Sequence, residues 1–241
     1  MKKLTTLLVA ILFTAGMAFA QGNDAHITQV SHTPPAIENN NNNDAYVDQT
    51  GFENVARVIQ GTLAPYSGAV TNNEARVFQI GEENYARQHQ VGSNNFARAD
   101  QDGADNRAYQ EQARGNNEAR IIQLGDDNEA RQSQDLITNT LEASNNFARI
   151  YQDGIGNYAR QDQDYSRNDA RIVQEGEDNW ARQSQDGMGN GQGYNMARTF
   201  QDGVGHWALT VQSGDLHFAR VDQAGEFNKA TVRQREFSTI Q

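Results

Sequence analysis

The stretch NEARVFQIGEENYARQHQ, residues 73–90, contains the pattern Asn-x-Ala-x-x-x-Gln twice, with an eleven-residue step between the two copies. The pattern recurs sixteen times between Asn43 and Gln234, and Ala and Gln keep their places in every copy. The leading Asn is replaced in two copies, by His206 and His217. A short fixed period of this kind predicts a stack of repeating units in which each unit contacts its neighbours.

The alternation of side chains within one unit indicates a strand. In residues 73–79, Asn, Ala, Val and Gln share one face, while Glu, Arg and Phe share the other. Eleven residues is also the period of a right-handed helical coil. However, Gly recurs two residues after the Gln, as at Gly81 and Gly103, and would interrupt such a helix repeatedly. Each unit is therefore predicted to be a seven-residue strand followed by a four-residue turn.

Alternate units differ, so the complete repeat has 22 residues. Two residues after the Ala, the first unit of a pair carries mainly Val or Ile, whereas most second units carry Gln. Insertions after Gln60, Gln134 and Gln185 divide the units into even blocks, so they interrupt only one edge. The repeat is thus a strand, a tight turn, a strand and a looser turn. Every first unit has a tight-turn glycine: Gly51, Gly81, Gly103, Gly125, Gly154, Gly176, Gly203 and Gly225.

These patterns predict an all-β fold, a parallel two-sheet β-solenoid of cross-β, amyloid-like type with about eight rungs. At about 4.8 Å per rung, its body would be about 38 Å long. Inner Asn and Gln would stack into amide ladders, each side chain bonding the one above and below, which satisfies groups that are costly to bury. The predicted ladder and core residues are Asn73, Ala75, Gln79, Asn84, Ala86, Gln90, Asn117, Ala119, Gln123, Asn128, Ala130, Gln134, Asn146, Ala148, Gln152, Asn157, Ala159 and Gln163.

Three segments follow from the chain's organisation. Residues 1–20 combine basic residues, an apolar run and a small-residue end, which predicts a secretory signal peptide cleaved after Ala20. Its removal takes the formal net charge from −11 to −13, because Lys2 and Lys3 leave with it. Residues 21–42 are predicted to be a flexible segment, and residues 43–241 the solenoid. Residues 23–29 also fit the strand motif, so a seventeenth strand is an alternative.

Composition narrows the function classes. The acidic charge argues against a nucleic-acid partner, and the absence of Cys excludes disulfides. No catalytic constellation is present, so we expect no enzyme and no cofactor. Acids stack at one turn position, as at Asp105 and Asp127, but the Gly-Gly-x-Gly-x-Asp signature of calcium solenoids is absent. We expect solvation and Arg pairing there rather than calcium. His206 and His217 are expected to replace ladder amides rather than bind metal.

The units resemble the curlin repeat of bacterial curli amyloid fibres. Residues 79–90 follow its pattern of a strand ending in Gln, a Gly-containing turn and Asn-x-Ala-x-x-x-Gln, and the resemblance covers residues 43–234. It implies a secreted, extracellular subunit that polymerises with itself or another curlin subunit, in cell-surface fibres for adhesion and biofilm matrix. It also implies an outer-membrane secretion channel with accessory factors, for which residues 21–42 would be the recognition tag. Asn in both half-repeats is closer to the minor, nucleating curlin.

The outward face leaves two interpretations open. Twelve units place Arg directly after the Ala, and aromatic residues often precede it, as at Tyr158 and Trp180. This is either a solvated face of ion pairs and Arg–ring contacts, or an adhesive stripe for a host surface, a polysaccharide or lateral packing. The alternative to a fibre subunit is a monomeric β-solenoid adhesin or ligand-binding module. Ice binding is disfavoured, because the outward residues vary too much.

Overall fold

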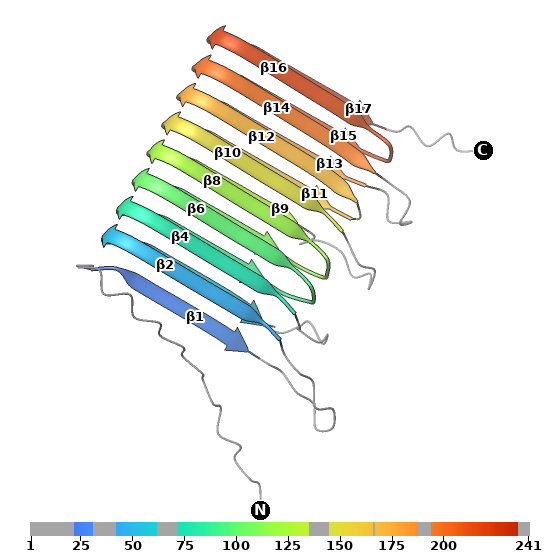
Figure 1. The fold of residues 1–241 in the computed structure, drawn as a ribbon. Helices are drawn as coiled ribbons and strands as arrows, with labels where there is room; N and C mark the ends of the chain where they lie inside the picture. The colour runs from blue at the N-terminus through green and yellow to red at the C-terminus, as the bar shows by residue number, and fades with distance from the viewer. Residues whose placement is uncertain are drawn as a thin grey trace, which may run out of the picture.

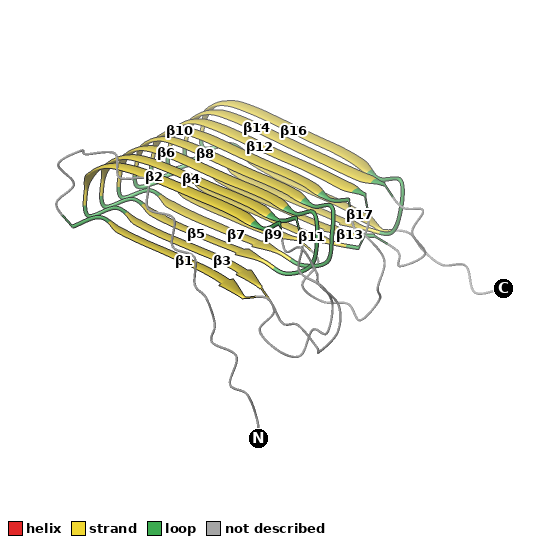
Figure 2. Ribbon diagram, turned by 60° about the horizontal axis from the view of Figure 1, so that its bottom comes forward, coloured by secondary structure: helices red, strands yellow, loops and turns green. Residues whose placement is uncertain are grey.

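Two parallel sheets, stacked face to face, make up the described part of the molecule (Figure 1; Figure 2). The computed structural model describes residues 22–30, 42–61, 72–134, 145–165, 167–187 and 194–235. The predicted signal peptide and the three insertions after Gln60, Gln134 and Gln185 lie largely or wholly outside these ranges. Within them, no helix is long and apolar enough to cross a membrane.

The odd-numbered strands form one sheet and the even-numbered strands the other. The first sheet, called the odd sheet below, has nine strands: β1 (Asp24–Val30), β3 (Val55–Gly61), β5 (Tyr85–Gln90), β7 (Arg107–Gln112), β9 (Glu129–Gln134), β11 (Tyr158–Asp164), β13 (Trp180–Asp186), β15 (Trp207–Ser213) and β17 (Lys229–Arg235). The even sheet has eight: β2 (Asp44–Phe52), β4 (Glu74–Glu82), β6 (Phe96–Ala104), β8 (Glu118–Asp126), β10 (Phe147–Ile155), β12 (Asn168–Glu177), β14 (Asn195–Val204) and β16 (Phe218–Glu226).

Equivalent positions of the repeat lie beside one another in every strand pair. Ala75 aligns with Ala97 and Gln79 with Gln101 between β4 and β6. The register is kept across an insertion, since Gln134 aligns with Gln163 between β9 and β11. The parallel two-sheet solenoid predicted from the sequence is therefore confirmed, with eight two-strand rungs from β2–β3 to β16–β17. β1 adds one further strand to the odd sheet only.

The backbone at the tight turns, which form one edge of the stack (the tight edge), requires the recurring glycines. Gly81 and Gly103 have φ values of 109° and 132°, in the left-handed half of the map that disfavours residues with a Cβ. A Cβ on Gly81 would also overlap the carbonyl oxygen of Gly103 in the next rung. Strands of the even sheet continue through this glycine, so β4 has nine residues rather than the predicted seven. The chain then reverses over a few residues, in which Glu83 also has a positive φ of 53°.

The space between the sheets is narrow and partly polar. Its apolar part consists of small and branched side chains such as Ala75, Val77, Ile121 and Ile150, all with 0% exposure. Gln and Asn columns border it on the same inward faces. Because most inner side chains are small or amide-bearing, hydrogen bonding must supply much of the order that a larger apolar core would supply.

Candidate functional site: the two end faces of the solenoid

The Gln columns run through the stack as directed chains of hydrogen bonds. Gln79 Nε2 donates to Gln101 Oε1 at 2.8 Å, and Gln101 Nε2 donates to Gln123 Oε1 at 2.8 Å. Gln79 Nε2 also donates to the backbone carbonyl of Asn84 at 3.0 Å, which fixes the tight turn of its own rung. In this column, each Nε2 therefore donates to the Oε1 of the next rung towards the C-terminal end, and each Oε1 accepts an N–H from the N-terminal side.

The Asn columns work differently from the simple amide ladder expected from the sequence. Asn84 Oδ1 accepts the backbone N–H of Asn106 at 3.1 Å, and Asn84 Nδ2 donates to the carbonyl of Gly103 at 2.8 Å. The amide thus ties its rung to the backbone of the next one. A side-chain bond from Asn106 Nδ2 to Asn84 Oδ1, at 3.1 Å, adds to this in some rungs only. Backbone polar groups at the turns are therefore the main partners of these Asn side chains.

All eighteen ladder and core residues named from the sequence lie on the inward faces and are buried. A second Gln column, which that selection omitted, lies deeper in the odd sheet. Gln88 Nε2 donates to Gln110 Oε1 at 2.8 Å and to the carbonyl of Arg76, across the sheets, at 2.8 Å. The same arrangement continues through Gln110, Gln132, Gln161 and Gln183. The 22-residue alternation of Gln with Val or Ile was the signal that could have identified this column.

His206 makes two of the hydrogen bonds that Asn84 makes in the equivalent position, one to the N–H of the next rung and one to the carbonyl four residues earlier in its own turn. Its Nδ1 lies 3.2 Å from the backbone N of Asn228, and its Nε2 lies 3.1 Å from the carbonyl of Asp202. Nδ1 is thus placed to accept the Asn228 N–H, and Nε2 is placed to donate to the Asp202 carbonyl. His217 holds the equivalent contact to the Ser213 carbonyl at 3.1 Å. Within the described residues no group of three or more His, Asp or Glu side chains could hold a metal ion.

The two end faces are chemically complementary as a consequence of these directed columns. At the C-terminal face, Gln223 and Gln234 are the last described members: their Oε1 atoms accept from Gln201 and Gln212, and their Nε2 groups donate to backbone carbonyls but to no further Gln among the described residues. At the other end, Gln49 and Gln29 begin the columns with Oε1 acceptors. Among the described residues, the outermost strands of both faces also have one backbone edge with no strand paired to it, and such edges are templates for further strands. Head-to-tail contact would bring the Nε2 donors of one copy towards the Oε1 acceptors of the next, whereas contact between like faces would oppose donor to donor or acceptor to acceptor.

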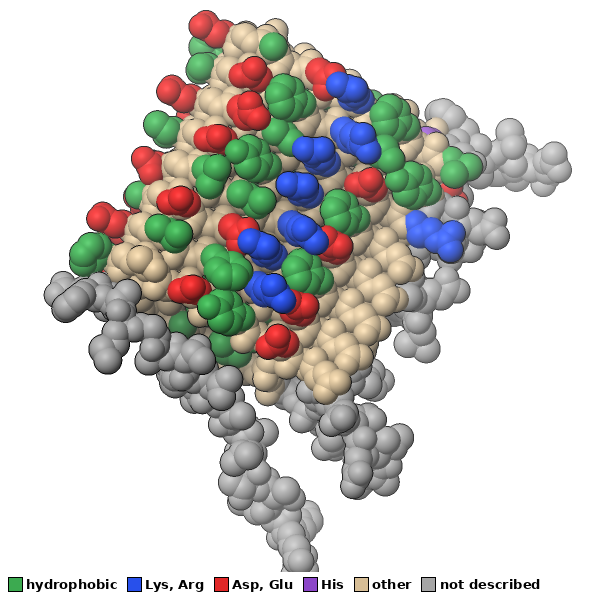
Figure 3. Space-filling view, in the orientation of Figure 1, with side chains coloured by type: hydrophobic (Ala, Val, Ile, Leu, Met, Phe, Trp, Pro, Cys, Tyr) green, Lys and Arg blue, Asp and Glu red, His purple; other side chains and the backbone are tan. Residues whose placement is uncertain are grey.

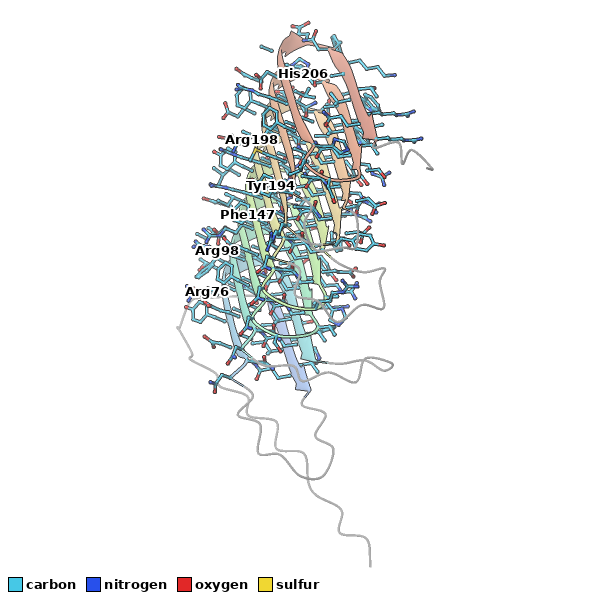
Figure 4. The ribbon with its side chains drawn as sticks, turned by 90° about the vertical axis from the view of Figure 1, so that its right-hand side faces the viewer. Arg76, Arg98, Phe147, Tyr194, Arg198 and His206 are labelled. Atoms are coloured by element: carbon cyan, nitrogen blue, oxygen red, sulfur yellow. The ribbon has the colours of Figure 1, made fainter. Side chains whose placement is uncertain are left out.

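The outer face of the even sheet carries a row of arginines. Figure 3 shows basic side chains in a line across the strands, with acidic and hydrophobic side chains on both sides. Arg98 pairs with Asp100 at 2.9 Å and Arg120 with Glu118 at 2.6 Å, while Arg98 and Arg120 also lie over Phe78 and Phe96. Figure 4 shows Arg76, Arg98 and Arg198 along one side of the stack. The solvated interpretation of this face accounts for these contacts.

Aromatic rings on the odd sheet stack on one another along the molecule. Trp180 and Trp207 are nearly parallel, with centroids 5.0 Å apart, and Tyr158 stacks on Trp180 at 6.0 Å. Lys229 Nζ lies 4.7 Å from the centre of the Trp207 ring. Because the faces of these rings are turned towards each other, they are less available as flat platforms for a sugar ring than isolated exposed aromatics would be.

Two aspartates next to the looser turns, which form the opposite edge of the stack (the loose edge), make the stability of the fold depend on pH. Asp164 and Asp186 align between β11 and β13, and burial raises the pKa of each, with Asp186 raising that of Asp164 further. A raised folded-state pKa means that ionisation at neutral pH opposes folding, and that stability grows as pH falls through this pKa. We expect Asp164→Asn to melt at a higher temperature than wild type at pH 7, with the difference shrinking towards pH 4.

Thermal melting followed by circular dichroism across this pH range is the measurement. Asp162→Asn is the matched control, because Asp162 faces outward and pairs with Arg160 and Arg182 at 2.9 and 3.2 Å. That variant should melt at or slightly below the wild-type temperature at pH 7. An Asp164→Asn variant that melts lower than wild type at pH 7 would contradict the assignment.

Comparison with known families agrees with this geometry. A family model, the curlin associated repeat, matches residues 71–103. Residues 71–103 therefore carry the curlin associated repeat. The matched window contains β4, β5 and nearly all of β6, that is, one full rung and the start of the next. Ala75 and Gln79, which occupy the Ala and Gln positions of the repeat, align with the equivalent Ala and Gln in all the other strands of the even sheet. A search of curated proteins gave no match.

Proposed function

We propose that this chain is a structural subunit that assembles end to end into amyloid-like fibres of the curli kind. The observation that carries the proposal is the complementarity of the end faces: amide donors leave one face and amide acceptors open the other. A contact between two different faces does not close on itself, so repetition generates a filament. Each added copy would extend both sheets with the same register as the internal rungs, as the curlin repeat also suggests.

The setting of such a fibre is part of the proposal. We infer export by residues 1–20, passage through an outer-membrane secretion channel with accessory factors, and a place at the cell surface in adhesion and biofilm matrix. Asn at the start of both half-repeats suggests a role closer to nucleation than to bulk elongation. The outward arginine row is the surface offered to host molecules or polysaccharide, although most of its members are already engaged with acids or rings.

Gly225 permits a test that separates folding from assembly. It occupies the tight-turn position of the last rung with a φ of 95°, and an added Cβ would meet nothing within 4 Å. In each of the other tight-turn glycines the same Cβ would overlap the carbonyl of the next rung. We therefore expect Gly225→Ala to fold with only the backbone strain of about 1–2 kcal/mol, yet to lose fibre growth by at least tenfold.

Seeded growth followed by thioflavin fluorescence and sedimentation is the readout, on the mature chain that begins at Gln21. Gly187→Ala is the control, because its added Cβ would make only ordinary contacts, the nearest at 3.6 Å to Tyr165 Cβ. It should grow at the wild-type rate. Wild-type chain that stays monomeric at high concentration would refute the fibre proposal and favour the solitary adhesin or binding module.

A further inference from the structure

β1 occupies one end of the odd sheet in the manner of an internal strand. It pairs with β3 in parallel, and its Ala25 and Gln29 align with Ala56 and Gln60. Gln29 Nε2 donates to Gln60 Oε1 at 2.9 Å, and Asn23 Oδ1 accepts the N–H of Asn54 at 2.9 Å. The same two kinds of hydrogen bond join successive rungs inside the stack. In the odd sheet, β1 therefore pairs with β3 as an internal strand would.

Across the stack, β1 lies at the end of the even sheet, where Gln49 Nε2 of β2 donates to the Asp24 carbonyl at 3.3 Å and Gln29 Nε2 donates to the Asn43 carbonyl at 3.1 Å. The even sheet ends at β2, whereas the odd sheet ends one strand further out, so the two sheets contain eight and nine described strands. Figure 1 shows β1 alone beyond the level of β2. The exposure of its inward residues reflects this: Ile27 is 36% exposed, while Val58, in the equivalent position of β3, is 0% exposed. Among the described residues, β1 thus has one neighbour in its own sheet and meets only the end of the even sheet, whereas internal strands have a neighbour on each side and a continuous facing sheet.

The difference of one strand conflicts with end-to-end stacking. At the C-terminal face, β16 and β17 form a complete rung. When β16 of one copy lies beside β2 of the next, its β17 must lie beside β3, because both strands belong to the same rung. That position is the one that β1 occupies. β17 has the same register features as β1: Ala230 and Gln234 align with Ala208 and Gln212 of β15, as Ala25 and Gln29 do with β3.

We propose that β1 is a removable cap on the N-terminal face, and that the occupant which replaces it is the β16–β17 rung of a second copy. This inference rests on the proposed fibre function and adds which strand must move. The incoming rung continues both sheets at once, whereas β1 continues only one, so exchange gains backbone and amide hydrogen bonds in the even sheet. With β1 in place, a copy can offer its C-terminal face but cannot receive another copy on its N-terminal face.

A disulfide between β1 and β3 tests this, because the chain has no natural Cys. Thr28 and Ile59 align in adjacent parallel strands and both face outward, so Thr28→Cys with Ile59→Cys locks the cap. The matched control is His89→Cys with Glu111→Cys, which joins the same outward position of β5 and β7. A third variant lacks residues 21–41 and therefore has no cap. Each is checked for fold by circular dichroism and for disulfide formation by mass spectrometry.

Seeded growth is then followed with and without reductant. We expect the oxidised lock to elongate wild-type seeds at least tenfold more slowly than the oxidised control, to stop wild-type growth at the N-terminal end when mixed in, and to recover on reduction. The chain without residues 21–41 should grow faster than wild type. If wild type forms fibres and the oxidised lock elongates as fast as the control, β1 stays in the fibre and the cap proposal is wrong. If wild type forms no fibres, the fibre function itself fails, and the cap proposal fails with it.

Discussion

Replacing Gly154 by Ala is expected to destabilise the solenoid by about 3 kcal/mol or more, the sum of backbone strain and overlap. Gly154 has a φ of 132°, and its added Cβ would overlap the carbonyl oxygen of Gly176 in the next rung. The overlap involves backbone on both sides, so no side-chain rotation relieves it. The rungs β10–β11 and β12–β13 would have to separate, which breaks the Gln and Asn columns at that level.

Chemical denaturation followed by far-ultraviolet circular dichroism measures this effect. Gly225→Ala shares the positive φ but has no rung above it among the described residues, so its loss should be about 1–2 kcal/mol. Gly187→Ala has neither a positive φ nor a close contact and should change stability by less than about 1 kcal/mol. If the three variants prove equally stable, the glycine at the tight edge is not what allows the rungs to approach.

Replacing Gln123 by Leu is the second change with a large expected effect, about 3 kcal/mol. Gln123 Nε2 donates to the carbonyls of Arg107 and Asn128 at 3.1 and 2.8 Å and to Gln152 Oε1 at 2.9 Å. Its Oε1 accepts from Gln101 at 2.8 Å. Leu has similar bulk but leaves buried partners on both adjacent rungs without a hydrogen bond, and each such group costs about 1–3 kcal/mol.

Arg120→Ala in the same strand is the control for this prediction. Arg120 lies on the outer face with 45% of its side chain exposed, and pairs with Glu118 at 2.6 Å. Its loss should cost less than about 1 kcal/mol, because solvent screens an exposed pair. Thermal and denaturant unfolding of both variants decides between the faces. A similar loss of stability for Gln123→Leu and Arg120→Ala would mean that the inward and outward faces contribute alike.

The repeat predicts the architecture well because each unit has the same pattern of inward, outward and turn residues. Alternation of side chains around Ala75 and Ala86 predicts two strands, and Gly81 between them predicts the tight edge. One short unit alone could be assigned to a strand or a helix, but sixteen copies in register favour the strand. The insertions divide the units into even blocks, which indicates which of the two turns can lengthen. The predicted sheets, their parallel direction and the rung count of about eight all follow from this periodicity, and the structure confirms them.

What the sequence did not predict depends on partners in three dimensions. Whether Asn84 bonds an amide or a backbone carbonyl depends on how closely the next turn approaches, which composition does not indicate. The direction of the Gln columns, and hence the difference between the end faces, needs the positions of individual atoms. β1 was only one of two alternatives for its segment, because a single strand motif cannot indicate which sheet it joins.

The most direct test of end-to-end stacking is the axial rise per subunit in fibres of the mature chain, measured by electron cryomicroscopy. Eight rungs at about 4.8 Å predict one copy every 38 Å or so, with strands perpendicular to the fibre axis and both sheets continuous across each junction. A rise near 43 Å would show that β1 remains in the stack as a ninth level. Strands parallel to the fibre axis, or copies joined through their outer faces, would contradict the account.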